Sequence, residues 1–254
     1  MNEFVITFDI DWAPDFMIDA VASLVSAKGI RATWFVTHAC AAVERLRENS
    51  DLFELGIHPN FLPGSTHGHT PMEVVSHLLA IVPEAISVRS HAVVQSSPVL
   101  ELMINRTPLV VDSTLFLPHM SHIHPIEYEH FGGVLLRIPF FWSDDYEVGK
   151  KPPQWDLMPY LEVEGLKVFD FHPIHVYLNS DDERPYQKLK QEGVNLNEIT
   201  PQMASPYIQK GRGAQTLLMN LLDYLVGTGR SVRLSDIYDH WRGERYRDEK
   251  HSSH

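Results

Sequence analysis

Short apolar runs alternate with amphipathic stretches along most of the chain. Residues 4–9 read Phe-Val-Ile-Thr-Phe-Asp and are apolar at nearly every position, which is typical of a strand buried on both faces. Residues 14–28 begin with Pro14, repeat their apolar positions with helical spacing and stop at Gly29. Because the two patterns keep alternating, the sequence predicts a parallel sheet covered by helices.

Further runs of the same kind predict about eight strands in all, at 4–9, 32–37, 53–58, 85–91, 109–113, 134–142, 166–172 and 231–234. The helices are expected at 14–28, 39–48, 71–82, 98–105 and 214–226. We therefore predict an α/β fold, a distorted (β/α)7–8 barrel. An open doubly wound sheet is the alternative.

Two segments break the alternation. Residues 59–70 are rich in Gly, Pro, Ser and His and are expected to form a functional loop. Residues 179–210 are polar and poorly periodic, and we expect an excursion or a lid over the site there. The remaining organisation predicts one domain over 1–246, followed by a polar, disordered tail at 247–254.

Composition narrows the classes of function. The 254 residues are 44% hydrophobic, which is enough for one large core. A formal net charge of −12 argues against a nucleic-acid partner, since phosphate contacts need clustered positive charge. Cys40 is the single cysteine, and the first residues lack a signal-peptide pattern, so a cytoplasmic location is expected. No apolar run reaches the roughly 18 residues of a membrane helix, so no membrane insertion is expected.

Residues able to do chemistry stand at the ends of several predicted strands. Asp9 and Asp11 close the first, His58 the third, and His172 the strand at 166–172. The carboxyl ends of parallel strands meet on one face of a barrel, where barrel enzymes carry their active sites. The sequence therefore predicts an enzyme.

The first of these groups has the composition of a metal site. Asp9 and Asp11 are two apart, so both would face the same side of an extended strand. His58 is followed in the next loop by His67 and His69. A carboxylate with two imidazoles leaves positions open for water and substrate, as a hydrolytic Zn²⁺ or similar ion requires. An isolated Asp pair or loop His is more often a helix cap or a solvated side chain.

Arg89 and His91 lie at the end of the strand predicted at 85–91. A buried Arg must pair with a carboxylate, and an Asp of the first strand is the expected partner. We expect His91 to contact the substrate. His172 is a candidate general acid, because an imidazole titrates near neutral pH.

Aromatic and polar side chains gather in two further places. Trp142 and Asp145 combine an aromatic face with a carboxylate, which suits a sugar ring, although core packing explains such an aromatic run equally well. His175 follows His172 by three residues. Trp142, Asp145 and His175 are therefore expected to bind substrate.

These motifs, in this order, resemble those of the NodB-homology polysaccharide deacetylases, carbohydrate esterase family 4. The resemblance covers roughly residues 4–235 and rests on Thr7-Phe8-Asp9-Ile10-Asp11, Glu54-Leu55-Gly56-Ile57-His58, Arg89 and Phe171-His172. Its WbmS-like branch, linked to bacterial surface-polysaccharide loci, is similar in His58-Pro59-Asn60-Phe61, Arg89-Ser90-His91, Ile138-Pro139-Phe140-Phe141-Trp142 and Phe171-His172-Pro173-Ile174.

The resemblance implies a metal-dependent amide hydrolase that removes an N-acetyl group from a sugar or glycan in lipopolysaccharide biosynthesis. One divalent ion, expected to be Zn²⁺, would be held by Asp11, His58 and either His67 or His69. The ion would lower the pKa of a bound water and polarise the amide carbonyl, and Asp9 would take the water's proton. Arg89 would orient Asp9 and keep it ionised. His172 would protonate the departing amine.

Two departures from the family pattern keep other hypotheses open. Ile10 separates the aspartates, so which of them is base and which is ligand is not fixed by order. Position 62 is Leu62, where the family has its second metal histidine. A catalytically silent carbohydrate-binding barrel and an amidohydrolase acting on a small non-sugar substrate are the alternatives.

Overall fold

A computed structural model describes residues 3–130, 132–191 and 195–252. Nine strands form one sheet: β1 (Phe4–Asp9), β2 (Ala32–Val36), β3 (Phe53–Ile57), β4 (Ser87–Val88), β5 (Val111–Asp112), β6 (Ile126–His130), β7 (Gly133–Arg137), β8 (Trp142–Ser143) and β9 (Lys167–Phe171). Their order is β6-β7-β5-β4-β3-β2-β1-β9-β8, and every pair is parallel except β6 with β7.

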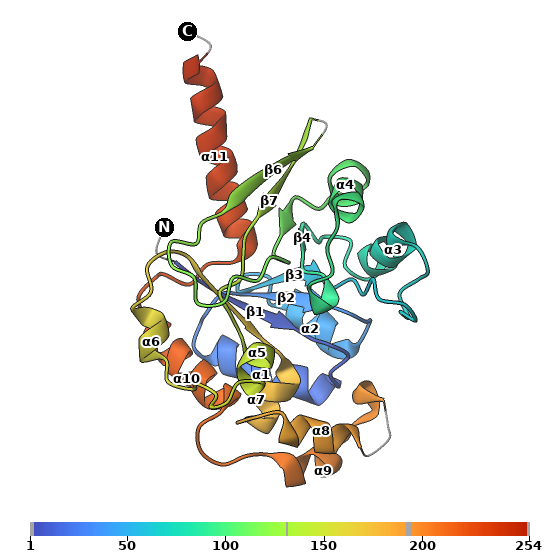
Figure 1. The fold of residues 1–254 in the computed structure, drawn as a ribbon, viewed down its shortest axis with the longest axis vertical. Coiled ribbons are helices and arrows are strands. Elements are labelled where there is room, and N and C mark those ends of the chain that lie inside the picture. Colours follow the sequence, from blue (N-terminus) through green and yellow to red (C-terminus); the bar gives the residue numbers. More distant parts are fainter. Residues whose placement is uncertain (1–2, 131, 192–194, 253–254) are drawn as a thin grey trace.

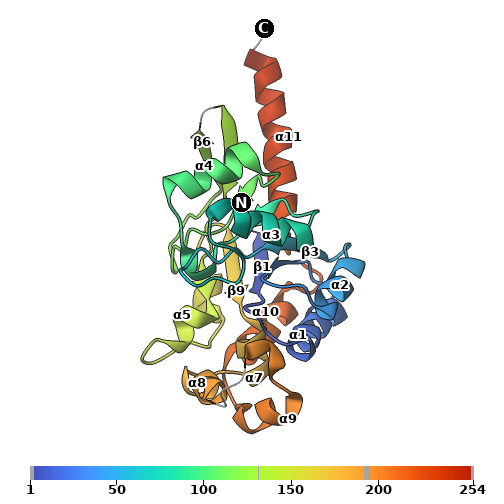
Figure 2. The ribbon, with the colours of Figure 1, turned by 90° about the vertical axis from the view of Figure 1, so that its right-hand side faces the viewer.

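The α-helices are α1 (Asp15–Ala27), α2 (Ala41–Glu48), α3 (Pro71–Ile81), α4 (Ser97–Arg106), α5 (Asp144–Val148), α6 (Met158–Leu161), α7 (Pro173–Leu178), α8 (Arg184–Lys190), α9 (Pro201–Ala204), α10 (Ala214–Leu225) and α11 (Leu234–Ser252). Three short 3-10 helices are η1 (His91–Val93), η2 (Leu196–Glu198) and η3 (Ser205–Tyr207). Helices surround the sheet, α11 projects beside the β6–β7 hairpin, and α8 and α9 lie at the opposite end of the molecule (Figures 1 and 2).

The sheet is a curled half-barrel, which confirms the predicted α/β fold and distorted barrel. β1 lies between β2 and β9, and all six of its residues are buried. Its apolar side chains enter a core that receives the buried faces of α1, α2 and α10. Burial on both faces explains why the first strand is apolar throughout.

The strand predicted at 134–142 is two strands on opposite sides of the gap in the barrel. β7 pairs with β5, whereas β8 pairs with β9. Pro139, which has no backbone N–H, stands between them. The Phe140 N–H donates to Leu115 O (2.9 Å) and the Phe141 N–H donates to Val168 O (2.8 Å), so this segment crosses from one edge of the sheet to the other.

Two other strand predictions need correction. β6 was missed because it is an edge strand whose mostly exposed residues include Glu127 and Glu129. The strand expected at 231–234 reduces to one parallel bridge between Ser231 and Phe4. α11 begins directly afterwards, where Asp236 accepts a hydrogen bond from the Arg233 N–H (2.8 Å).

The excursion predicted at 179–210 contains α8, η2, α9 and η3 in its described part. Leu189 and Ile199 pack with Met17 of α1 and with Ile174 and Leu178 of α7 in a second, smaller core. The segment is therefore anchored to the barrel by buried apolar contacts.

The C-terminal segment expected to be a disordered tail, 247–254, continues α11 as far as Ser252, and its last two positions lie outside the described residues. Arg247, Glu249 and Lys250 in this segment favour helix. Within the described residues, no helix combines the length and apolar character needed to cross a membrane.

Candidate active site

The carboxyl ends of β1, β3, β4 and β9 open into one cleft of about 390 Å³. The carboxyl, imidazole and guanidinium groups that line it belong to Asp9, Asp11, His58, Arg89, His91, Asp145, Asp170 and His172. The sequence prediction that strand ends assemble one site is supported by this arrangement.

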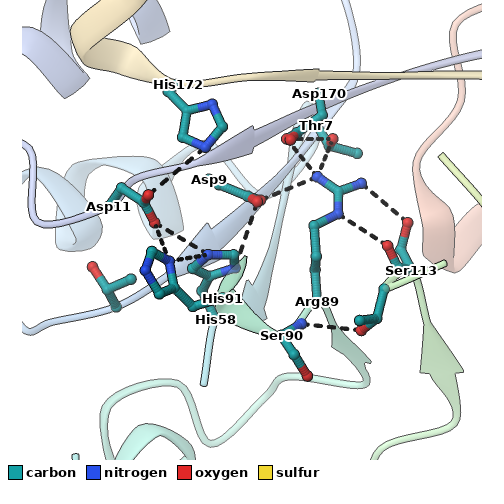
Figure 3. A network of polar contacts seen from close by, with 12 residues as sticks. Thr7, Asp9, Asp11, His58, Arg89, Ser90, His91, Ser113, Asp170 and His172 are labelled. Carbon is teal, nitrogen blue, oxygen red and sulfur yellow. Dashed lines mark hydrogen bonds and ion pairs between the residues drawn. The ribbon is translucent and has the colours of Figure 1, made fainter. Parts of the chain in front are cut away.

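Asp11, His58 and His91 form a tight triad at one side of the cleft (Figure 3). Asp11 Oδ1 lies 3.1 Å from His58 Nε2 and 3.2 Å from His91 Nδ1. The two ring nitrogens are 3.3 Å apart. Bonds of about 2.0 Å around a tetrahedral Zn²⁺ separate neighbouring ligand atoms by roughly 3.3 Å, so the spacing and the donor types fit such an ion.

The ionisation of the triad suits a cation site as well. Burial opposes ionisation of Asp11, but hydrogen bonds with His58 and His91 outweigh it and hold the pKa of Asp11 well below its usual range. Burial likewise disfavours the charged form of His91, but the Asp11 carboxylate outweighs this and raises the pKa of His91. The triad therefore holds a carboxylate that is charged at neutral pH.

His67 and His69, predicted as alternatives for the third ligand, do not join this triad, and His91, predicted to bind substrate, stands there instead. The His67 ring is buried elsewhere, where Nδ1 accepts a hydrogen bond from the Asn60 N–H (3.2 Å). The His69 side chain is exposed, and its backbone N–H donates to Glu73. The reason for the correction is that α3 and its capping box direct the second half of the loop away from the cleft.

Arg89 is the centre of a second, buried network. Its guanidinium donates to Asp9 Oδ1 (3.1 Å) and to Asp170 Oδ1 (2.5 Å). It also donates to the Ser113 carbonyl oxygen (3.0 Å), and the Phe35 and Phe140 rings lie on it at 4.7 and 4.6 Å. The predicted pairing of Arg89 with an aspartate of the first strand is confirmed, and Figure 3 shows Asp9 between this network and the triad.

Asp170 is the carboxyl group that the sequence reading missed in this network. It is almost fully buried on β9, two residues before His172. Burial raises its pKa to about 8, although the Arg89 charge acts in the opposite direction and the Asp9 charge adds to the rise. One guanidinium thus serves two carboxyl groups, and burial drives Asp170 toward its neutral form.

His172 is held by Asp144, the first residue of α5. Asp144 Oδ2 accepts the His172 backbone N–H at 2.8 Å, and Asp144 Oδ1 lies 2.6 Å from Nδ1. Burial disfavours the imidazolium, but the charges of Asp145 and Asp144 outweigh it and raise the pKa of His172 well above its usual range. Nε2 is left on the cleft side, 3.7 Å from Asp11 Oδ2.

Asp145 and His175, both predicted to bind substrate, pair with each other at the rim. His175 Nε2 is 2.8 Å from Asp145 Oδ1, and the His175 ring contacts Tyr186 of α8 at 5.2 Å. Burial opposes ionisation of Asp145, but the His172 and His175 charges lower its pKa far below normal. Asp145 lines the cleft, whereas His175 is buried behind it.

Trp142 was expected to offer a sugar-stacking face, and the structure contradicts this. Its side chain is fully buried, and its ring contacts Trp155, Tyr160, Phe169 and Phe171. The alternation along β8 explains the correction, because Trp142 faces the core and the following Ser143 lines the cleft.

Four non-glycine residues, three lining the cleft and one next to it, have a left-handed backbone. They are Asp11 (φ 37°), Trp12 (φ 56°), Ala92 (φ 52°) and Val93 (φ 49°). Such conformations are uncommon for non-glycine residues and concentrate at functional sites. Asp11 therefore reaches the site through a tight turn after β1, and not through the strand alternation from which its position was predicted.

Comparisons with known proteins agree with the family resemblance found in the sequence motifs. The family model described as "WbmS-like: Polysaccharide deacetylase" matches residues 6–190. WbmS of Bordetella bronchiseptica, whose solved structure is described as that of a polysaccharide deacetylase involved in O-antigen biosynthesis, shares 32% identity and a TM-score of 0.75. That match covers 88% of this chain and 90% of WbmS. No match was found among proteins with curated functional descriptions.

Two more distant structures share the fold alone. The 4-α-glucanotransferase of Thermococcus litoralis is 10% identical, with a TM-score of 0.51 over 93% of this chain and 38% of that chain. A family 4 acetyl xylan esterase of Clostridium thermocellum, solved with a cobalt ion, is 12% identical, with a TM-score of 0.50 over 93% of this chain and 91% of that chain. The family match and the similarity to WbmS together show that this chain belongs to the WbmS-like family of polysaccharide deacetylases.

Proposed function

We propose that the protein hydrolyses the N-acetyl group of a sugar unit in a surface glycan of the O-antigen type. The observation that carries this is the cleft itself, in which the Asp11–His58–His91 triad, Asp9 and His172 meet. Water adds to the acetamide carbonyl carbon, the C–N bond breaks, and acetate and a free amine are released. The O-antigen context rests on the similarity to WbmS.

Asp11, His58 and His91 would hold a divalent cation, with Zn²⁺ expected from this donor set. When bound, such an ion supplies Lewis-acid chemistry that activates water and polarises a carbonyl group. Three protein ligands leave room for water and substrate, as a catalytic rather than a structural site requires.

Asp9 would act as the general base. It lies between the triad and Arg89, 3.6 Å from His58 Nδ1 through Oδ2 and 3.1 Å from the guanidinium through Oδ1. The hydrogen bond from the guanidinium fixes the orientation of the carboxyl group. Asp9 can therefore accept a proton from the attacking water beside the triad.

His172 would act as the general acid. Asp144 accepts from Nδ1, which leaves Nε2 on the cleft side as the nitrogen that gives its proton to the leaving amine. Because its pKa is raised, His172 holds that proton at neutral pH. Asp9 and His172 thus both lie beside the triad (Figure 3), and a carboxylate oxygen of Asp9 and a ring nitrogen of His172 are within 4.8 Å of each other.

The experiment is a parallel measurement of metal content and acetate release. Purified protein is stripped with chelator, reloaded with Zn²⁺, and assayed on N-acetylated oligosaccharides. About one ion per chain, with acetate release that requires the ion, supports the proposal. Bound sugar without ion or acetate release would favour the catalytically silent barrel, and acetate release only from small non-sugar amides would favour the other hydrolase. The cytoplasmic location expected from the sequence stays a prediction.

A further inference from the structure

A second cavity, of about 590 Å³, lies beside the catalytic cleft and takes no part in the chemistry proposed for it. Trp12 lines this cavity, and its ring contacts His91 of the triad edge-on at 5.2 Å. A ring that lines the cleft and a ring that lines the second cavity are thus in contact. Asp11 faces the cleft and Trp12 the second cavity, which follows from the left-handed turn formed by these two residues.

The wall of this second cavity is polar, and its described lining residues include no aspartate, glutamate, lysine or arginine. Its amide and imidazole groups come from Asn60, Asn195, Asn197, His38, His67 and His77. Side-chain amides both donate and accept hydrogen bonds, as sugar hydroxyl and acetamido groups do. With one aromatic ring, Trp12, the lining has the mixed apolar and polar character of a small-molecule site.

The His67 imidazole supports a neutral occupant. Burial lowers its pKa to about 4, the charge of His77 acts in the same direction, and a backbone contact with Thr37 only partly opposes this. Nδ1 accepts from the Asn60 N–H, so Nε2 carries the proton of the neutral ring. Within the described residues this buried Nε2 has no hydrogen-bond partner of ordinary geometry. A buried donor whose contact with the Thr37 backbone falls outside ordinary hydrogen-bond geometry is costly, and a bound hydroxyl oxygen would satisfy it.

We propose that this cavity, the Trp12 cavity, binds an uncharged sugar unit next to the one that is deacetylated. The inference rests on the proposed function and deepens it, because it makes the substrate an oligosaccharide or polymer rather than a single sugar. A diphosphate-linked carrier does not suit this cavity, since no lysine or arginine is among its described lining residues.

The test measures binding of neutral oligosaccharides to the full chain in chelator, so that no turnover occurs. Monomers and tetramers of N-acetylglucosamine and of N-acetylgalactosamine are titrated by calorimetry. The tetramer of at least one series is expected to bind about tenfold or more tightly than its monomer, since further hydrogen bonds and a stacking face are engaged.

Two variants locate that gain. Thr66 lines the Trp12 cavity and is exposed, so Thr66→Trp fills the space and should reduce the tetramer-to-monomer ratio to about one. Asn197→Ala removes one amide of the wall and should reduce the ratio about threefold to tenfold. His122→Ala, at a side chain that is 74% exposed outside both cavities, is the matched control and should leave the ratio unchanged.

Equal affinity for monomer and tetramer in both series, or a ratio that survives both cavity variants, overturns the proposal. Tighter binding of UDP-N-acetylglucosamine that Thr66→Trp abolishes would overturn it in favour of a nucleotide carrier. Acetate release by the Zn²⁺-loaded protein is measured separately. Length-dependent binding without acetate release would refute the proposed function alone, and acetate release without length dependence would refute the cavity proposal alone.

Discussion

The histidines on the two sides of Trp12 meet opposite electrostatic surroundings. On the cleft side, His91 and His172 lie beside carboxylates, which outweigh burial and raise their pKa values. In the Trp12 cavity, His38 and His67 are desolvated with little or no such compensation, and burial lowers their pKa values. The comparison teaches that an imidazole becomes a candidate ligand or acid through its carboxylate partner, and not through its presence in a histidine-rich loop.

The largest effect is expected on the cleft side of this comparison. His58→Ala removes one of the three groups of the triad, so Zn²⁺ content measured by elemental analysis should fall from about one ion per chain to near zero. Acetate release should fall at least about 1,000-fold with it. Unchanged metal content in this variant would place the ion elsewhere and remove the basis of the proposed site.

Asp9→Asn tests whether Asp9 is the general base or a metal ligand. The amide oxygen of the new side chain can still accept a hydrogen bond from Arg89, so the fold and the triad should persist. Metal content should therefore stay near that of the wild type. The kcat for acetate release should fall about 100- to 10,000-fold, because the attacking water loses its proton acceptor. Should this variant lose its metal while Asp11→Asn keeps it, the roles of the two aspartates would be exchanged.

Asp144→Asn reduces the difference in pKa between His172 and the histidines of the Trp12 cavity. The raised pKa of His172 depends on the Asp145 and Asp144 charges, so removing one charge lowers that pKa. A general acid must be protonated, and activity is therefore lost at lower pH in the variant than in the wild type. The profile of kcat/KM against pH should show its basic limb moved to lower pH, with about tenfold loss on the alkaline side. An unmoved basic limb would exclude His172 as the acid.

The smallest effects are expected for the two loop histidines. His67→Ala and His69→Ala should keep about one Zn²⁺ per chain, since neither side chain belongs to the triad. The exposed His69 should change the free energy of unfolding by less than about 0.5 kcal/mol, and the buried His67 by about 1 kcal/mol. Loss of metal from either variant, measured beside His58→Ala, would support His67 or His69 as the third metal ligand, as the sequence predicted. It would also contradict the conclusion that a carboxylate partner distinguishes the ligand histidines.

The parts of this fold that could be predicted are those with a strong local signal. β1, β3 and β9 are dense apolar runs, and Asp9, His58 and His172 stand directly at or after their ends. The open sheet edges and the crossing of 138–141 between them depend on distant strands, so no local pattern indicates them. Sequence alone thus predicted the barrel and the strand ends more securely than its closure.

The site was predicted only as far as strand ends go. His91 reaches the triad from η1, in which Ala92 has a left-handed backbone. A glycine at that position would have indicated such a conformation in the sequence, and an alanine does not. Asp170 lies inside an apolar strand, where its role depends on Arg89 from a strand far away in sequence. A buried arginine needs a carboxylate partner, and this requirement predicted the pairing of Arg89 with an aspartate of the first strand. It did not indicate that a second carboxyl group, Asp170, also pairs with Arg89.

The left-handed residues around the cleft also have a consequence for how this protein would respond to selection. A non-glycine residue in such a conformation costs of order 1–3 kcal/mol, which the surrounding structure must offset. Ala92→Gly should relieve part of that cost, and a library screened only for heat resistance is expected to accumulate such glycines. A screen for turnover should discard them if a looser turn no longer holds His91 at the triad. Thermal robustness and catalytic competence would then diverge at a handful of backbone positions.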